Sequence, residues 1–195
     1  MEPHAANLST IRQWLLEGQY QSILSLARHK KHILSQLTAL TYDENATVSQ
    51  RAIEVAGLAA KIIAERDSEF IRNTLLRLFW LVNDESGGIG WRAPELIGEI
   101  LYHCPQFQQF FPMLISLLDL EEEDAPRFYA GTFWAIGRVA QVAQEAMLPA
   151  LPRVQAYLSN DYPTEERKAT EQALWCIKQI TQENQPGECK PYTFV

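Results

Sequence analysis

The sequence has little cysteine and no long hydrophobic run. Its three cysteines, Cys104, Cys176 and Cys189, form no Cys-x-x-Cys pair and cannot all be paired within one chain, which predicts a reducing, cytoplasmic setting. The longest apolar stretches, such as residues 78–82, are far shorter than the about 20 residues that a membrane-spanning helix needs. Residues 1–10 lack a basic segment followed by an apolar one. We therefore expect a protein that neither spans a membrane nor is secreted.

Positive charge is also scarce, and the formal net charge is -7. Nucleic-acid binding draws much of its free energy from Lys and Arg that neutralise phosphates, so this composition disfavours nucleic acid as a partner. Hydrophobic residues make up 47% of the 195 residues and charged residues 21%, which is typical of a folded domain. The length favours one domain with its own core.

Signatures of catalysis and of cofactor binding are missing as well. The sequence has no Gly-x-Ser-x-Gly elbow, no Gly-x-Gly-x-x-Gly fingerprint and no His-Glu dipeptide. Cys104 has His103 beside it, but adjacency in sequence does not bring two side chains together. Glu95, Glu99 and His103 are four apart and share one face of a predicted helix, yet a metal site needs further ligands. We expect no catalytic, metal or cofactor site.

The glycine-rich stretch 83–90 precedes a predicted helix N-terminus, where free amides can accept an anion. It lacks a Gly-Lys-Ser/Thr ending and a preceding strand. The stretch is therefore predicted to be a shaped turn that presents Trp91 and Arg92.

What the sequence does contain is an internal repeat. Four similar segments begin at residues that are 41, 39 and 37 positions apart, and three of them end in glycine. They are Arg51-Ala-Ile-Glu-Val-Ala-Gly57, Arg92-Ala-Pro-Glu-Leu-Ile-Gly98, Gly131-Thr-Phe-Trp-Ala-Ile-Gly137 and Lys168-Ala-Thr-Glu-Gln-Ala-Leu174. Such a period is typical of stacked helical units.

Each segment follows a second amphipathic stretch with apolar residues three and four apart, so each unit is predicted to be two helices joined by a turn. A lone helical hairpin cannot cover its own apolar face, and neighbouring units must therefore stack around a shared core. The recurring glycines are predicted to let adjacent helices approach closely. The apolar positions of the first helices are Ile33, Leu34, Leu37 and Leu40; Phe70, Ile71, Leu75, Leu78 and Phe79; Phe110, Met113, Leu114, Leu117 and Leu118; and Leu148, Leu151, Val154 and Leu158.

On these residues the chain resembles the HEAT-repeat family, including its shorter variant in phycobilin-lyase-type proteins. The third copy departs from the pattern because it lacks the basic residue. The resemblance implies an all-α fold, a right-handed superhelix of four helical hairpins behind an N-terminal helical cap. The predicted parts are a cap at 7–29, repeats at about 30–66, 67–103, 104–143 and 144–182, and a tail at 183–195. The cap is predicted to consist of two helices, 8–17 and 20–29, broken at Gly18.

The predicted turns within the hairpins are acidic. These acids either cap the second helices or form a strip that attracts a basic partner. Pairs of opposite charge three apart, such as Arg51 with Glu54, Arg92 with Glu95 and Lys168 with Glu171, are predicted on the second helices. The acids are Asp43, Glu44, Asp84, Glu85, Glu121, Glu122, Glu123, Asp124, Asp161, Glu165 and Glu166.

Aromatic and arginine side chains accompany these pairs, and such residues often anchor interfaces. Some of the rings, alternatively, fill the core. We predict a non-catalytic interaction or scaffold module whose second helices, or whose acidic hairpin edge, bind a protein or peptide. The predicted partner-binding residues are Trp91, Arg92, Glu95, Glu99, Tyr129, Trp134 and Arg138.

The alternative class is enzymatic, because HEAT-like arrays also occur in alkylpurine DNA glycosylases and in phycobilin lyases. The nearest candidate for a catalytic acid is Asp84 or Glu95, beside Trp91 and Arg92. A glycosylase needs a basic concave face, which the acidic composition disfavours.

Overall fold

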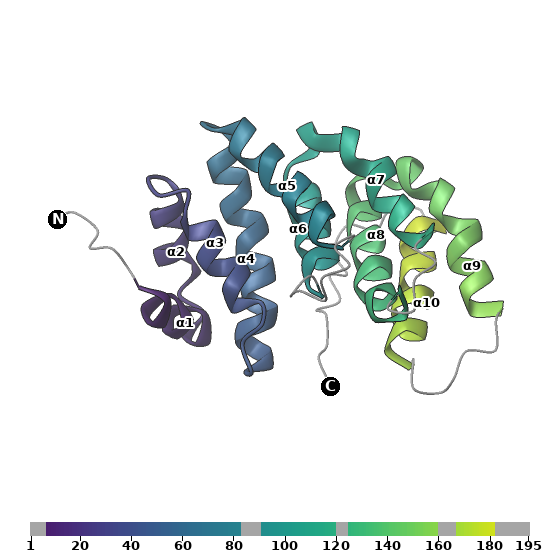
Figure 1. The fold of residues 1–195 in the computed structure, drawn as a ribbon, viewed down its shortest axis with the longest axis horizontal. Helices are drawn as coiled ribbons and strands as arrows, with labels where there is room; N and C mark the ends of the chain where they lie inside the picture. The colour runs from purple at the N-terminus through teal and green to yellow at the C-terminus, as the bar shows by residue number, and fades with distance from the viewer. Residues whose placement is uncertain (1–6, 83–90, 120–124, 160–166, 182–195) are drawn as a thin grey trace.

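A computed structural model describes residues 7–82, 91–119, 125–159 and 167–181. These residues form α-helices and short 3-10 turns and contain no strand, which confirms the predicted all-α class (Figure 1). The glycine-rich stretch 83–90 and the predicted tail with Cys189 lie outside them. The helices are α1 (Leu8–Glu17), α2 (Tyr20–Ala27), α3 (Ile33–Leu40), α4 (Ala46–Ala64), α5 (Ser68–Val82), α6 (Ala93–His103), α7 (Phe111–Ser116), α8 (Ala125–Met147), α9 (Leu151–Ser159) and α10 (Arg167–Thr181), with 3-10 turns η1 (Pro105–Phe110), η2 (Leu117–Asp119) and η3 (Leu148–Ala150).

The predicted break at Gly18 is confirmed, and its cause is a left-handed backbone with φ 71°. The amide of Gly18 donates to the carbonyl of Leu15, and the amide of Gln19 donates to that of Trp14. The guanidinium of Arg51, on α4, donates to the carbonyls of Leu15 and Leu16 at 2.7 and 2.9 Å. Side chain and turn together therefore satisfy the exposed end of α1 and fasten it to α4.

Replacing Gly18 with alanine is expected to lower the free energy of unfolding by about 1 kcal/mol, because a Cβ atom disfavours the left-handed conformation. Chemical denaturation measures this loss. A Gly18→Asn variant serves as the control and should lose less, since asparagine tolerates this region better. Equal stability of the alanine variant and the parent would contradict the proposed role of the turn.

The helices pair as the alternating amphipathic pattern predicts. Helix α3 packs against α4, α5 against α6, α7 against α8 and α9 against α10. The side-chain oxygen of Asn45 caps α4 by accepting hydrogen bonds from the backbone amides of Thr47 and Val48 at 3.0 and 3.3 Å. Most of the predicted apolar positions are buried, but Met113 and Leu148 are 39% and 47% exposed. Leu148 belongs to η3 rather than to α9, so the helical spacing does not extend to it.

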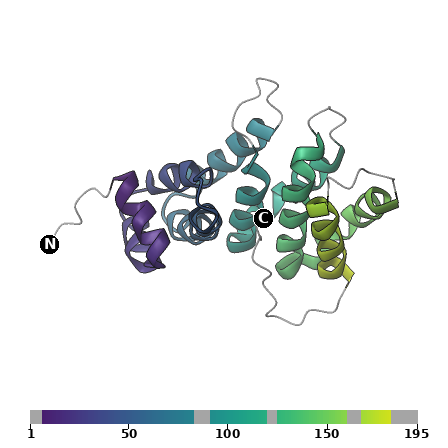
Figure 2. The same ribbon diagram turned by 90° about the horizontal axis from the view of Figure 1, so that it is seen from below.

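The second helices of the four pairs also contact one another in order, α4 with α6, α6 with α8 and α8 with α10. Figure 1 and the turned view of Figure 2 both show the helix pairs following one another along the long axis. The contact surface between second helices therefore continues through the chain. None of the described helices is long and apolar enough to cross a membrane.

Glycines lie where these second helices cross. A Cβ atom added to Gly57 would lie 2.8 Å from the carbonyl oxygen of Glu99, and one added to Gly98 would lie 2.6 Å from the Cα of Ala135. One added to Gly137 would lie 2.5 Å from the Trp175 ring. The prediction that these glycines permit close helix approach is confirmed.

Candidate partner-binding site

The structure divides the seven predicted partner-binding residues by burial. Trp91 is 54% exposed, and Arg92 and Tyr129 are partly buried. The expectation of an accessible Trp134 is wrong, because this ring is only 5% exposed. The residues that lie in the interior are Glu95, Glu99, Trp134 and Arg138.

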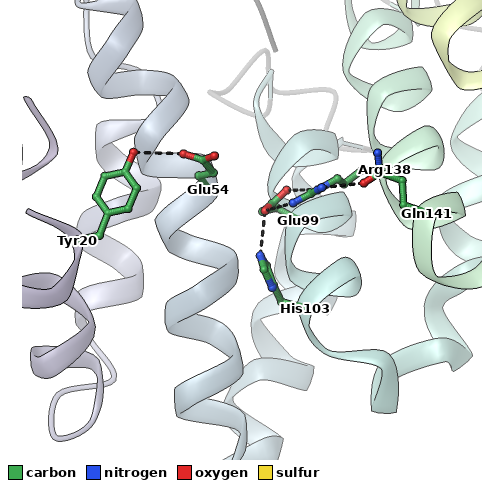
Figure 3. A network of polar contacts seen from close by, with 6 residues as sticks. All are labelled: Tyr20, Glu54, Glu99, His103, Arg138 and Gln141. Carbon is green, nitrogen blue, oxygen red and sulfur yellow. Dashed lines mark hydrogen bonds and ion pairs between the residues drawn. The ribbon is translucent and has the colours of Figure 1, made fainter. Parts of the chain in front are cut away.

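Glu99 and Arg138 form a buried ion pair between α6 and α8 (Figure 3). The Nε and Nη2 atoms of Arg138 donate to the two carboxylate oxygens of Glu99 at 2.9 and 3.1 Å. The Nε2 atom of His103, one turn further along α6, lies 3.1 Å from the same carboxylate. A bidentate arginine–carboxylate contact is directional as well as strong. It therefore fixes how α6 and α8 lie against each other.

Arg138 makes further contacts with α6 on one side and, through Gln141, with α10 on the other. Its guanidinium carbon lies 3.5 Å from the centre of the Tyr102 ring, a cation–π contact. Its Nη1 atom donates to Gln141 at 2.8 Å, and the amide of Gln141 donates to Gln179 of α10 at 3.2 Å. One line of polar side chains thus links α6, α8 and α10.

This ion pair can be predicted from the sequence by comparing successive repeat units, although not from composition or from spacing within one helix. Glu99 follows Arg92 by seven residues, and Arg138 follows Gly131 by seven. The two charges therefore occupy the same place in successive units, 39 residues apart. Opposite charges at equivalent positions of stacked units are neighbours.

Glu95, which is 1% exposed, belongs to a second buried cluster. It accepts a hydrogen bond from Nη1 of Arg92 at 3.1 Å, so this predicted pair is confirmed. A Cβ atom on Gly131 would lie 2.5 Å from the carboxylate of Glu95, so this carboxylate lies against the backbone of α8. Burial and the charge of Arg92 lower the pKa of Lys168, while Glu95 opposes them. Lys168 of α10 therefore lies within electrostatic reach of Arg92 and Glu95 at the start of α6.

The other two predicted pairs are wrong. Arg51 turns to the end of α1, and Glu54 instead accepts from the hydroxyl of Tyr20 at 3.2 Å (Figure 3). The partner of Glu171 is Arg167, four residues earlier, at 3.1 Å. Arg51 and Glu54 find partners on neighbouring helices, whereas Glu171 pairs at spacing four within α10.

Tyr129 takes part in an internal aromatic cluster. Its ring stacks on Phe133 with centroids 5.7 Å apart and meets the edge of Tyr157 at 5.3 Å. Because Tyr157 belongs to α9, these rings join α8 to α9. Tyr129 therefore contributes to packing, as the core alternative for the aromatic residues predicts.

The accessible residues Trp91 and Arg92 of the predicted site form an edge with Tyr42, a residue that was not predicted from the sequence to bind a partner. We call this surface the Tyr42–Trp91 edge. Tyr42 is 38% exposed and Trp91 is 54% exposed. The backbone amide of Arg92 donates to the hydroxyl of Tyr42 at 3.4 Å, so the turn after α3 meets the start of α6. Two exposed rings and a guanidinium are the side-chain types that anchor interfaces.

Among the acids of the predicted hairpin edge, Asp43 and Glu44 are described. Asp43 is bound by Nε of Arg12 at 2.6 Å, and the hydrogen bond from Arg12 lowers the pKa of its carboxyl. This acid thus serves to hold α1 to the first hairpin. The predicted acids outside the described residues are Asp84, Glu85, Glu121, Glu122, Glu123, Asp124, Asp161, Glu165 and Glu166.

Cys104 does not form a nucleophilic site with His103. The thiol is fully buried, and burial raises its pKa to about 12. The ring of His103 contacts Glu99. A buried thiol of this kind stays protonated at neutral pH and is unreactive.

No family model matches the sequence, and no solved structure matches it. A protein of Archaeoglobus fulgidus that bears the name "Uncharacterized protein" is 34% identical over 113 residues. The match covers 57% of this chain and 56% of the relative, so the chain spans little more than half of that protein's length.

Proposed function

We propose that the chain is a HEAT-like, right-handed helical solenoid that acts as a non-catalytic interaction module, with a protein or peptide bound at the Tyr42–Trp91 edge. Successive helix pairs and the contact of each second helix with the next support the solenoid. Glycines at equivalent places, Gly57, Gly98 and Gly137, give the stacking a repeated geometry. In the proposed architecture, α1 and α2 are the cap and the four helix pairs are the repeats.

The observation that carries the binding function is the exposure of Trp91 beside Tyr42 and Arg92. Trp91 is 54% exposed, so a partner that covers its ring would bury a large apolar area. The guanidinium of Arg92 is oriented by the buried carboxylate of Glu95, so little rotamer freedom remains to be lost on binding. The buried residues of the predicted site then act as the rigid support of this edge.

Replacing Trp91 with alanine is expected to weaken partner binding by about 2 kcal/mol, or roughly 30-fold in affinity, as for other interface anchors. Its stability should change by less than about 1 kcal/mol, because an exposed ring contributes little packing. Affinity capture from native extract, quantified by mass spectrometry, measures recovery of each partner. Thermal unfolding measures stability in parallel.

The matched control is Trp80→Ala, which removes a tryptophan that is 64% exposed on α5. Partners of the Tyr42–Trp91 edge should be recovered with the parent and the Trp80 variant and lost with the Trp91 variant. Equal recovery with all three proteins would overturn the proposed surface.

A further inference from the structure

A hollow of about 850 Å³ lies away from the Tyr42–Trp91 edge, where the link between α2 and α3 meets the link between α4 and α5. Leu26 and Ile33, which line it, are 4% and 2% exposed and belong to the core. Basic and imidazole side chains make up much of the remaining lining. They are His29, Lys30, Lys31, His32 and Arg66.

The lining carries more positive than negative charge. Lys30, Lys31 and Arg66 are opposed by the single carboxylate of Asp67, so the balance is positive by two with both histidines neutral. This concentration of positive charge contrasts with a chain whose net charge is -7. An anion is therefore attracted to this place even though the molecule as a whole repels it.

Two of the cations are held in place. Nη2 of Arg66 donates to the carbonyl of Ala27 at 3.1 Å, which fastens the guanidinium to the end of α2. Nζ of Lys31 donates to Asp67 at 2.7 Å and lies 4.9 Å from the centre of the Phe70 ring. The four remaining Arg66 N–H groups can donate to an oxyanion without giving up the bond to Ala27.

The start of α3 adds the positive end of a helix dipole. Its first amides, those of Ile33, Leu34 and Ser35, already donate to carbonyls of the preceding turn. Recognition would therefore fall to side chains, and Ser35 and Gln36 add a hydroxyl and an amide to the lining.

We propose that this hollow binds the phosphate group of a small phosphorylated ligand. Arg66 and Lys30 neutralise the phosphate oxygens with charge-assisted hydrogen bonds. The hollow is much larger than one phosphate, and Leu26 and Ile33 offer apolar contact to the organic part. The proposal is independent of the interaction function at the Tyr42–Trp91 edge.

The test is titration of the isotope-labelled full chain with pyrophosphate and with phenyl phosphate, followed by amide and methyl NMR. We expect shifts at residues 29–36 and 66–67 with both probes, and at the methyl groups of Leu26 and Ile33 with phenyl phosphate. Binding should weaken several-fold between about 50 and 200 mM salt, because contacts of this kind are screened.

Two variants test the basic and imidazole side chains of the lining. Lys30→Gln/Arg66→Gln is expected to lower the affinity for both probes about tenfold or more. Lys30→Gln/His32→Gln preserves the hydrogen bond from Arg66 to Ala27 and should lower the affinity for both probes about threefold or more. The control Arg72→Gln/Arg77→Gln removes two exposed cations of α5 outside the hollow, and its affinity should match that of the parent.

Vesicles of phosphatidylcholine with and without phosphatidic acid separate the two sources of phosphate. Binding of the soluble probes identifies a free metabolite, and binding of phosphatidic acid vesicles alone identifies a lipid headgroup; both support phosphate recognition here. The proposal is overturned if neither source binds at concentrations up to about 10 mM, which corresponds to an affinity weaker than about -3 kcal/mol. It is also overturned if the control weakens binding as much as the test variants.

Discussion

Replacing Arg138 with methionine is expected to lower the free energy of unfolding by about 3–5 kcal/mol, because it leaves the carboxylate of Glu99 buried without its main partner. Glu99 is 1% exposed, and the Arg138 side chain is 7% exposed. The loss should appear in chemical denaturation and as a lower midpoint of thermal unfolding.

The matched control is Arg72→Met, which breaks a pair between Arg72 and Glu69 at 3.3 Å on the surface of α5. Both side chains are about half exposed or more, so the loss should be below about 1 kcal/mol. The double variant Glu99→Leu/Arg138→Met removes both charges and should be less destabilised than the sum of its single variants by about 2 kcal/mol. Additive losses would show that the ion pair does not couple α6 to α8.

The architecture follows from sequence because it depends on local spacing. Apolar residues three and four apart locate the helices, Gly18 marks the first break, and glycines such as Gly57 and Gly98 mark the places where helices cross. Each of these signals is read within one segment or by comparing segments at the repeat distance.

The burial of the predicted partner-binding residues did not follow from the sequence, because burial of a charged residue depends on what lies opposite it. Every residue from 131 to 140 is buried, although the second helices are expected to have one solvent face. The signal was available, since Arg138 is the one charged residue in that stretch. A helix that is apolar all round is an interior helix, so Trp134 belonged to the core, and a charge in that setting needed a partner such as Glu99.

The same geometry makes Gly98→Ala the most informative small substitution. Alanine is favoured over glycine within a helix by about 1 kcal/mol. If α6 and α8 were loosely packed, Gly98→Ala would therefore raise the free energy of unfolding. The added Cβ atom would instead lie 2.6 Å from both the Cα and the Cβ of Ala135. Because the obstacle includes backbone, the helices must separate, and we expect a net loss of about 2 kcal/mol in chemical denaturation.

Second substitutions distinguish a backbone obstacle from a side-chain one. Adding Ala135→Gly should not restore the Gly98→Ala variant, since the backbone of residue 135 still lies 2.6 Å from the added Cβ atom. At Gly137 the nearest obstacles are ring carbons of Trp175 at 2.5 and 2.8 Å. Once Trp175→Leu has removed the ring, the Cα of Cys176 at 3.1 Å is the closest remaining obstacle. The further loss of stability from Gly137→Ala should then be smaller than in the parent, so the two losses are less than additive. The opposite outcome would be that Ala135→Gly restores the stability of the Gly98→Ala variant while the losses from Gly137→Ala and Trp175→Leu add. That outcome would show that a side chain limits the approach at Gly98 and that the backbone limits it at Gly137.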